Sequence, residues 1–518
     1  MNYLQKVFDG LRNVSHGEAI VSDRRRLTGE QVLSETYRIT RALASCGIAP
    51  GMTVASLTEN SAEAVTSRLA TQLLGARYLG LRPGYSTAQH ARFLADTAPH
   101  ALLIESELLA SGEELAGLVP SVLGLGTDEP GPDVLDLAED EPDTPIAPAA
   151  APGNLATVTC TGGSTGTPKV VCCSYANADA YLRVARRMYG AAPWRFLVGM
   201  PVSDLGGEIA QWTFAVGGTA VLWAEEFSAT DTLTALRRER ISHLFVAPPM
   251  LRPLAEEAAS SGEEVPALRQ VIYGGQPIPE AHVRTAVASF GGKLIQNYGQ
   301  QEAGFISVLT GADHVAGNRQ VLRSVGRPAP EVEIELREAD GAAAGGEAGE
   351  IWVRSPMVMP GYWNDPEHTA AVLRDGWLRT GDLGKLREDG YLQVVDRLAD
   401  MIMLNGTNVY SAQIEQALAE HPAIRDAAVV GVPDEVTGEA IYAAVTVVHE
   451  DSPPSGAEIR EHVIRMLGPL HAPAHLRFFP QLPVTGRSKP DKKALRERAA
   501  TDLAEQTASN RRSKHAGN

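Results

Sequence analysis

The chain has few cysteines, no long apolar run and a shortage of positive charge. Only four of its 518 residues are cysteines, and no two are spaced as CxxC, which excludes a disulfide framework and argues against a structural zinc site. No stretch of about 18 apolar residues occurs, so no segment is expected to span a membrane. The first residues also lack the apolar core of a signal peptide. We therefore expect a protein of the reducing cytoplasm.

The charge balance limits the partners of the protein. Lys and Arg number 46 against 63 Asp and Glu, a net charge of −17. This balance argues against a broad grip on nucleic acid or an anionic membrane, although one small phosphate site within a cleft is still allowed. Hydrophobic residues make up 44% and charged residues 21%, which is typical of a folded protein with a sizeable core.

The order of expected elements indicates an α/β protein. Helical and strand patterns alternate over the first 125 residues and again from Leu155 to about Val395, which predicts βαβ units and parallel sheets. A Pro-rich stretch over 128–153 reads as an exposed connection. We expect a large N-terminal region, 1–396, with βαβ sheets and a small β-barrel-like part. A small mobile α+β domain over 397–500 and a flexible tail over 501–518 would follow.

The most informative segment is Thr161-Gly-Gly-Ser-Thr-Gly-Thr-Pro-Lys169, directly after an apolar run. Glycines let the backbone turn tightly so that N–H groups converge on an anion, while the hydroxyls add donors and Lys169 adds charge. It is not a Walker A loop, because Pro168 and Val170 flank the lysine. Taken alone, the segment could equally be a surface loop.

Further motifs follow in order: Tyr273-Gly-Gly-Gln-Pro277, Asn297-Tyr-Gly-Gln-Gln-Glu302, Thr380-Gly-Asp382, Asp396-Arg397 and Thr485-Gly-Arg-Ser-Lys489. With the run Gly361-Tyr-Trp-Asn364, they make the chain resemble the adenylate-forming superfamily of acyl-CoA synthetases and adenylation domains over nearly its whole length. The resemblance implies an ATP-dependent acid–thiol ligase that forms an acyl-adenylate and transfers the acyl group to coenzyme A.

The resemblance also implies residue roles. Catalytic roles fall to Lys489, Glu302 and Arg397, and Glu302 would hold Mg²⁺. Tyr298 would stack on adenine, and Asp382 would accept hydrogen bonds from the ribose. ATP would be bound by Thr161, Gly162, Gly163, Ser164, Thr165, Gly166, Lys169, Gly274, Gly275, Gln276, Asn297, Tyr298, Gly299, Gln301, Asp382 and Arg397. Each role has a structural alternative; Tyr298 could be a core aromatic, for example, and Arg397 could form only an ion pair.

The acid and the acceptor are expected at two further places. Asp204, Gly206, Gly275 and Gly299 would contact the acid, and the small residues Gly206, Gly207 and Gly275 are compatible with a bulky acyl group. Asp204 could signal an amine or hydroxyl on the acid, or could instead cap a helix or lie in solvent. By resemblance, Gly406 and Thr407 would line a channel for the acceptor thiol, and the small domain would rotate between the two steps.

Several positions depart from the family pattern. Gln301 replaces a threonine that normally helps to bind the α-phosphate, Ala399 lies at the hinge, and Met403 replaces a lysine used for thioester formation in some relatives. Two alternatives to the CoA ligase therefore stay open. One is a stand-alone adenylation enzyme that loads an amino or aryl acid onto a separate carrier protein, since no fused carrier is expected. The other is a nucleotide- or acyl-binding homologue without catalysis.

Overall fold

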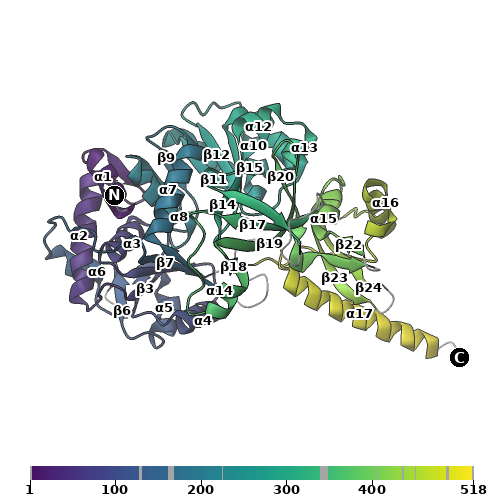
Figure 1. The fold of residues 1–518 in the computed structure, drawn as a ribbon, viewed down its shortest axis with the longest axis horizontal. Helices are drawn as coiled ribbons and strands as arrows, with labels where there is room; N and C mark the ends of the chain where they lie inside the picture. The colour runs from purple at the N-terminus through teal and green to yellow at the C-terminus, as the bar shows by residue number, and fades with distance from the viewer. Residues whose placement is uncertain are drawn as a thin grey trace.

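The computed structural model describes residues 3–127, 131–160, 169–224, 226–338, 348–404, 407–434, 437–449, 451–485 and 489–515, with the backbone alone at 110–113 and 504–515. The described residues up to Arg397 form a large body, and the described residues after it lie at one side of this body (Figure 1). The last helix, α17 (Lys492–His515), reaches away from the large body.

Two mainly parallel sheets form the large body. The six-stranded sheet has the order β6 (Val122–Leu125), β5 (Ala101–Glu105), β3 (Thr53–Leu57), β4 (Arg77–Leu81), β7 (Leu155–Cys160), β8 (Val170–Ser174). The nine-stranded sheet has the order β15 (Arg327–Pro328), β14 (Gly304–Leu309), β13 (Leu294–Gln300), β12 (Gln270–Gly274), β11 (His243–Val246), β9 (Arg195–Val198), β10 (Thr219–Leu222), β1 (Glu18–Val21), β2 (Arg26–Thr28). Antiparallel pairs occur only at their ends: β7–β8, β13–β14, β14–β15 and β1–β2.

Helices cover both faces of each sheet. The largest core cluster joins residues of both sheets with residues of α1 (Tyr3–Asn13), α3 (Ala62–Leu73), α7 (Tyr175–Tyr189) and α8 (Leu205–Ala215), so these helices lie between the sheets. Other core clusters lie on the outer faces. They involve α2 (Gly29–Ser45), α4 (Thr87–Thr97), α5 (Leu109–Ala116), α6 (Val134–Glu139), α9 (Ala229–Arg238), α10 (Pro248–Ser261) and α11 (Glu280–Phe290).

Local sequence signals explain where elements begin and end. Thr28 and Gln31 form the reciprocal hydrogen bonds of a capping box at the start of α2, and Gly47 follows the helix with a φ of +85°. The buried face of α2 includes Val32, Thr36 and Leu43, as helical periodicity requires. These short-range signals fix the helix before any tertiary contact is considered.

An antiparallel five-stranded sheet completes the large body. It contains β16 (Glu333–Arg337), β17 (Gly349–Arg354), β18 (Leu373–Arg374), β19 (Trp377–Leu386) and β20 (Leu392–Arg397). Three short helices, α12 (Gly311–Ala316), α13 (Arg319–Leu322) and α14 (Pro366–Val372), lie in the connections before and within it. Strand β20 is the last of the large body and leads directly into the C-terminal part.

The C-terminal part has its own sheet and two core clusters. The strands are β21 (Ile402–Leu404), β22 (Thr407–Val409), β23 (Ile424–Asp434), β24 (Gly438–Val447) and β25 (His475–Phe478), with helices α15 (Ser411–Ala419) and α16 (Gly456–Leu467). The predicted α/β fold with a small C-terminal α+β part is confirmed.

The tail expected over 501–518 is helical in its described part, because residues 501–515 continue helix α17. Its flexibility stays a prediction. Leu495 and Ala499 are buried in a core cluster, so the first turns of the helix are packed. The following residues include many that favour helix, such as alanine, glutamate, glutamine and arginine, which extend a helix without an apolar face.

Candidate active site

The carboxylate of Asp382 is the centre of the best-defined polar cluster. Oδ2 accepts hydrogen bonds from the Tyr298 hydroxyl at 2.6 Å and from the Gln300 amide at 2.8 Å, and Oδ1 lies 3.4 Å from Nε of Arg397. Asp382 and Arg397 are direct partners on β19 and β20. Burial, together with the Asp382 charge, raises the pKa of Tyr298 well above its usual value, so this hydroxyl stays a donor. Three predicted nucleotide residues therefore meet at one point.

The strand ends beside this cluster carry the glycines predicted to contact adenine. Gly274 ends β12 next to Asn297, and a Cβ there would lie only 2.2 Å from the Asn297 carbonyl oxygen. Gly275 has a φ of +90° and is exposed, so its backbone is open to a ligand. The Asn297 amide donates to the Tyr189 hydroxyl at 2.6 Å. These positions lie at the carboxyl ends of parallel strands, where ligands of open α/β sheets bind.

Lys169 and Glu302 lie on two sides of Tyr362. The ammonium nitrogen of Lys169 is 4.9 Å from the centre of the Tyr362 ring, and the Tyr362 hydroxyl donates to Glu302 Oε1 at 3.3 Å. Pairing of Trp363 N–H with the Val170 carbonyl at 2.8 Å holds this segment against β8. Burial and the nearby Glu302 raise the pKa of Tyr362. The residues Thr161 to Gly166, predicted to bind phosphate, lie outside the described residues.

Glu302 is the predicted magnesium ligand. Mg²⁺ takes oxygen ligands and usually needs only one or two carboxylates, because substrate phosphates and water complete its shell. Within the described ranges, no group of three His, Cys, Asp or Glu side chains is arranged to hold a metal ion. A single carboxylate beside Lys169 therefore fits an ion shared with phosphates, and does not fit a site built from protein ligands alone.

The predicted acid-binding residue Asp204 faces the carboxyl end of β13. Its Oδ1 accepts a hydrogen bond from the Gln301 amide at 3.2 Å, and its Oδ2 lies 3.6 Å from Nη1 of Arg82. Asp204 stands at the N-cap of α8 without a side-chain hydrogen bond to that helix, and its side chain is only 10% exposed. The Asp204 side chain therefore neither caps the helix nor lies in solvent, which were the two structural alternatives for it.

The glycines near Asp204 do not provide the room that their size suggested. A Cβ on Gly206 would lie 2.1 Å from the Met200 carbonyl oxygen, and one on Gly207 would lie 2.2 Å from Nη1 of Arg68. Protein atoms therefore fill the space beside both. Gly299 is similar, with the Gly304 carbonyl oxygen at 2.3 Å, whereas Gly275 has nothing within 4 Å. Only Gly275 leaves open space.

The C-terminal candidates lie beyond β20. Lys489 precedes α17, and its carbonyl accepts the N–H of Thr485 at 2.7 Å. Thr407 begins β22 and is exposed, while Gly406 lies outside the described residues. That Lys489 shares a pocket with Asp382 and Tyr298 stays a prediction.

Sequence reasoning missed two residues of the site. Gln300 holds Asp382, and Tyr362 lies between Lys169 and Glu302. A signal existed for each. Gln300 is two positions after Tyr298 on β13, so alternation puts both side chains on one face. Tyr362 belongs to the run Gly361 to Asn364, which supported the family resemblance without receiving a role.

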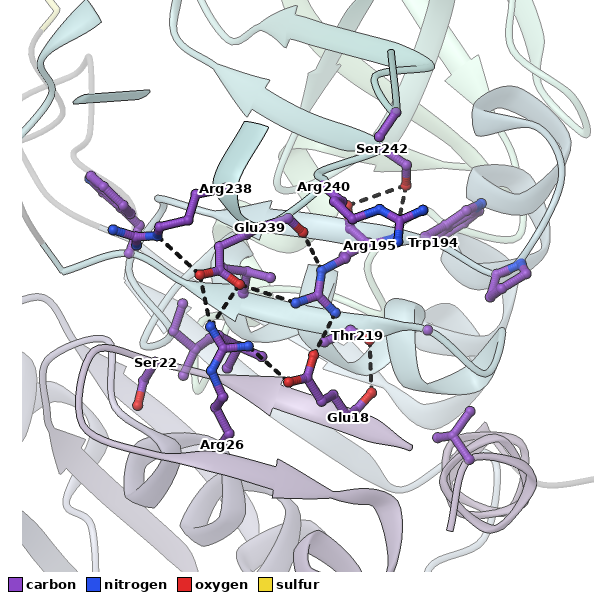
Figure 2. A pocket seen from close by; sticks show the side chains of 18 of the residues that line it. Glu18, Ser22, Arg26, Trp194, Arg195, Thr219, Arg238, Glu239, Arg240 and Ser242 are labelled. Carbon is purple, nitrogen blue, oxygen red and sulfur yellow. Dashed lines mark hydrogen bonds and ion pairs between the residues drawn. The ribbon is translucent and has the colours of Figure 1, made fainter. Parts of the chain in front are cut away.

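A large cavity lies away from this cluster. Its volume is about 980 Å³, and none of the predicted site residues lines it. Arg195 begins β9 and Arg269 precedes β12, so the cavity is at the sheet edge opposite Gly274. Figure 2 shows Arg26 and Arg195 bound to Glu18 and Glu239, with Arg26–Glu18 at 2.8 Å. Because these charges satisfy one another, we assign the network a structural role.

The chain matches the family model for AMP-binding enzymes over residues 11–363 and the model for the C-terminal domain of AMP-binding enzymes over residues 413–489. It belongs to the AMP-binding enzyme family, which confirms the resemblance. None of the helices in the described part of the chain has the length and apolar character needed to cross a bilayer.

Three relatives indicate the range of activities. The medium/long-chain-fatty-acid–CoA ligase FadD8 of Mycobacterium tuberculosis is 34% identical, over 91% of this chain and 86% of the relative. The fatty acid–[acyl-carrier-protein] ligase ScoC of Streptomyces coeruleorubidus is 31% identical over 94% of both. The structure of amide bond synthetase McbA from Marinactinospora thermotolerans is similar with a TM-score of 0.89, at 43% identity over 96% of this chain and 98% of that chain. The predicted class, an AMP-forming ligase, is confirmed.

Proposed function

We propose that the protein activates a carboxylic acid with ATP and forms an acyl-adenylate with release of pyrophosphate. The thiol of coenzyme A then takes the acyl group, and AMP leaves. The observation that carries the proposal is the Asp382 cluster, a buried carboxylate held by Tyr298, Gln300 and Arg397 beside an open glycine strand end. The family of the chain and the names of its CoA-ligase relatives support the same chemistry.

The chemistry needs positive charge, because the acid and the triphosphate are both anions. Two unit charges about 4 Å apart repel by roughly 4 kcal/mol at an effective dielectric of about 20. Lys169 and Lys489 would provide fixed cations, and Mg²⁺ bound to Glu302 would neutralise phosphate oxygens. Asp382 would accept hydrogen bonds from the ribose hydroxyls, and Tyr298 would hold the base. Preorganised charge of this kind lowers the barrier without reorganisation during the reaction.

Two domains would divide the work. The proposed large domain, 1–396, would bind ATP and the acid, and the small domain, 397–500, would rotate about Ala399. One pose would bring Lys489 to the carboxylate and the α-phosphate. The other would present Gly406 and Thr407 to the acceptor. The separate sheet and core of the C-terminal part support this division, because a part that packs against itself can move as a unit.

An amine acceptor is a second candidate, favoured by the hairpin of β21 and β22. From Met401 to Ala412 the sequence contains neither lysine nor arginine, and the N–H of the 43% exposed Met403 donates to Glu439 at 2.6 Å. Coenzyme A carries several phosphate charges that would gain from cations here, whereas an uncharged or cationic amine would not need them. The 43% identity to an amide bond synthetase agrees with this candidate.

The two steps can be tested separately. Carboxylate-dependent exchange between ATP and pyrophosphate reports adenylation alone, and a protein without exchange for a broad set of acids would contradict the proposed function. With an active acid, coenzyme A, a phosphopantetheinyl carrier protein and a primary amine are then compared by mass spectrometry of the products. A thioester of coenzyme A supports the first proposal. An amide without a thioester supports the second.

A further inference from the structure

The last residue of β13, Gln300, and the two residues that follow it, Gln301 and Glu302, face three parts of the proposed site. The Gln300 amide donates to Asp382, on the ribose side. The Gln301 amide donates to Asp204, on the acid side. Glu302 accepts a hydrogen bond from Tyr362, beside Lys169 on the phosphate side. The three side chains thus point to the proposed ribose, acid and phosphate positions, and that of Gln301 points to the acid position.

The carboxamide of Gln301 is only half satisfied. Its Nε2 donates to Asp204 Oδ1 at 3.2 Å, while its Oε1 is buried and has no donor among the described residues. Exchanging the two atoms would point the carbonyl oxygen at a carboxylate, which is repulsive, so the orientation follows from the charge of Asp204. A buried acceptor without a donor from the protein is unfavourable, and a water or a ligand then has to supply the donor.

Asp204 is held in place by several groups. Arg82 lies 3.6 Å from its Oδ2, and Nη1 of the buried Arg68 donates to its backbone carbonyl at 3.3 Å. Asp204 and Gln301 Oε1 together present acceptor atoms on the side where the acid is proposed to lie. The polarity of this wall selects for a ligand that carries a donor.

We propose that Gln301 is a specificity residue for the acid, not a ligand of the α-phosphate, and that with Asp204 it selects carboxylic acids that carry an N–H donor. The inference rests on the proposed function, because it assumes that an acid is adenylated here. It reverses the role that the family pattern gives to this position. Acids with a plain alkyl chain would leave Gln301 Oε1 without a donor, and would be poor substrates.

The test compares two acids of nearly equal shape. Indole-2-carboxylate carries an N–H, and 1-methylindole-2-carboxylate does not; hexanoate serves as the alkyl acid. ATP–pyrophosphate exchange gives kcat/KM for each acid and KM for ATP. The full-length protein is expected to prefer the N–H acid by about 10-fold or more, the usual effect of one charge-assisted hydrogen bond.

Gln301→Met keeps the size of the side chain and removes both polar atoms. It is expected to reduce the preference for the N–H acid to within about 3-fold while KM for ATP stays within about 2-fold. Gln300→Met is the matched control, since the neighbouring glutamine contacts Asp382. It should raise KM for ATP and keep the preference between the acids. Asp204→Asn, a second variant with unchanged size, should also weaken the preference by about 10-fold.

Several results would overturn the inference. A higher KM for ATP in Gln301→Met, with the acid preference intact, would show that Gln301 contacts the nucleotide and not the acid. An equal loss for both indole acids would show a merely structural role. Equal use of both acids by the unmodified protein, or use of hexanoate but neither indole acid, would also contradict it. Failure of every acid in the unmodified protein would instead reject the proposed function, and is distinguished by the absence of any exchange.

Discussion

Two neighbouring residues of β20, Asp396 and Arg397, contrast the proposed nucleotide side of the molecule with its C-terminal side. Arg397 points to the cluster around Asp382, where one carboxylate receives donors from Tyr298, Gln300 and Arg397. Asp396 points the other way and accepts hydrogen bonds from the Ser411 hydroxyl at 3.1 Å and the Ala412 N–H at 3.4 Å. Alternation along a strand therefore separates a residue that faces the proposed nucleotide site from one that holds the next part of the chain.

The C-terminal cluster has the opposite charge pattern. One ammonium group, that of Lys492, lies 2.9 Å from Glu415 and 3.7 Å from Asp400, and it also donates to the Ser411 hydroxyl at 2.8 Å. Asp396 adds a third carboxylate nearby and has its pKa raised, chiefly by burial. Several donors surround the one carboxylate of Asp382, as expected of a site that binds a polar ligand. Several carboxylates surround the one ammonium group of Lys492, as expected of a structural contact that does not change.

The largest expected effect comes from removing the cation assigned to the C-terminal side. Lys489→Ala should lower ATP–pyrophosphate exchange by about 10³-fold, because the reacting anions lose a preorganised cation. Acyl transfer from a chemically prepared acyl-adenylate should stay within about 3-fold, measured by product formation. Lys493→Ala, an exposed neighbour with the same change in charge, is the control. An equal loss in both half-reactions would contradict the two-pose proposal.

On the nucleotide side, Asp382→Ala should reduce kcat/KM for ATP by about 100-fold, or roughly 2.7 kcal/mol. The reason is that Tyr298 and Gln300 lose their acceptor and the ribose loses its partner. Steady-state exchange at varied ATP measures this change. Asp389→Ala changes an exposed acid in the turn between β19 and β20 and should leave KM for ATP unchanged. An unchanged KM in Asp382→Ala would place the ribose elsewhere.

Removing the cation of the C-terminal cluster should lower the free energy of unfolding of the C-terminal part. Lys492→Met leaves Asp396 and Glu415 without their shared cation, while Asp400 keeps its ion pair with Arg496 at 2.8 Å. Breaking a buried pair in this way typically destabilises by about 3–5 kcal/mol. Urea unfolding monitored over the whole chain should show an earlier transition for the C-terminal part, with that of the large body unmoved. Lys493→Met serves as the matched control. A single transition that shifts as a whole would show that the two sides unfold together.

The smallest expected effect concerns Glu208, a buried carboxylate that belongs to neither of the two clusters. Glu208 of α8 lies 3.8 Å from Arg68, and burial raises its pKa to about 7. Between its unfolded pKa, about 4.5, and 7, the folded state binds a proton that the unfolded state lacks, so this group's contribution to stability falls as pH rises. Glu208→Gln should therefore gain stability over the unmodified protein by about 1–3 kcal/mol between pH 5 and pH 8. A difference in Tm that stays constant with pH would contradict this.

Much of the fold followed from local pattern. The capping box at Thr28, Gly47 after α2 and the alternation of strands and helices predicted the α/β body, because each depends on residues close in sequence. Apolar periodicity gave no signal for helix α17 beyond Ala499, because this part of the helix is continued by residue propensity. The nucleotide candidates Tyr298, Asp382 and Arg397 were found through spaced motifs, and the structure brings these three together.

The sequence by itself determined the family of the protein and the types of group at its proposed nucleotide site, since short motifs keep their chemistry wherever they stand. Only the tertiary structure decided which neighbour each group meets. Gln301 and Asp204 are 97 residues apart, and their hydrogen bond forms because the end of β13 and the start of α8 meet at the same sheet edge. Gly206 and Gly207 have no side chains, yet the space beside them is occupied by Met200 and Arg68. Contacts across such distances depend on how sheets and helices pack, which no local pattern encodes.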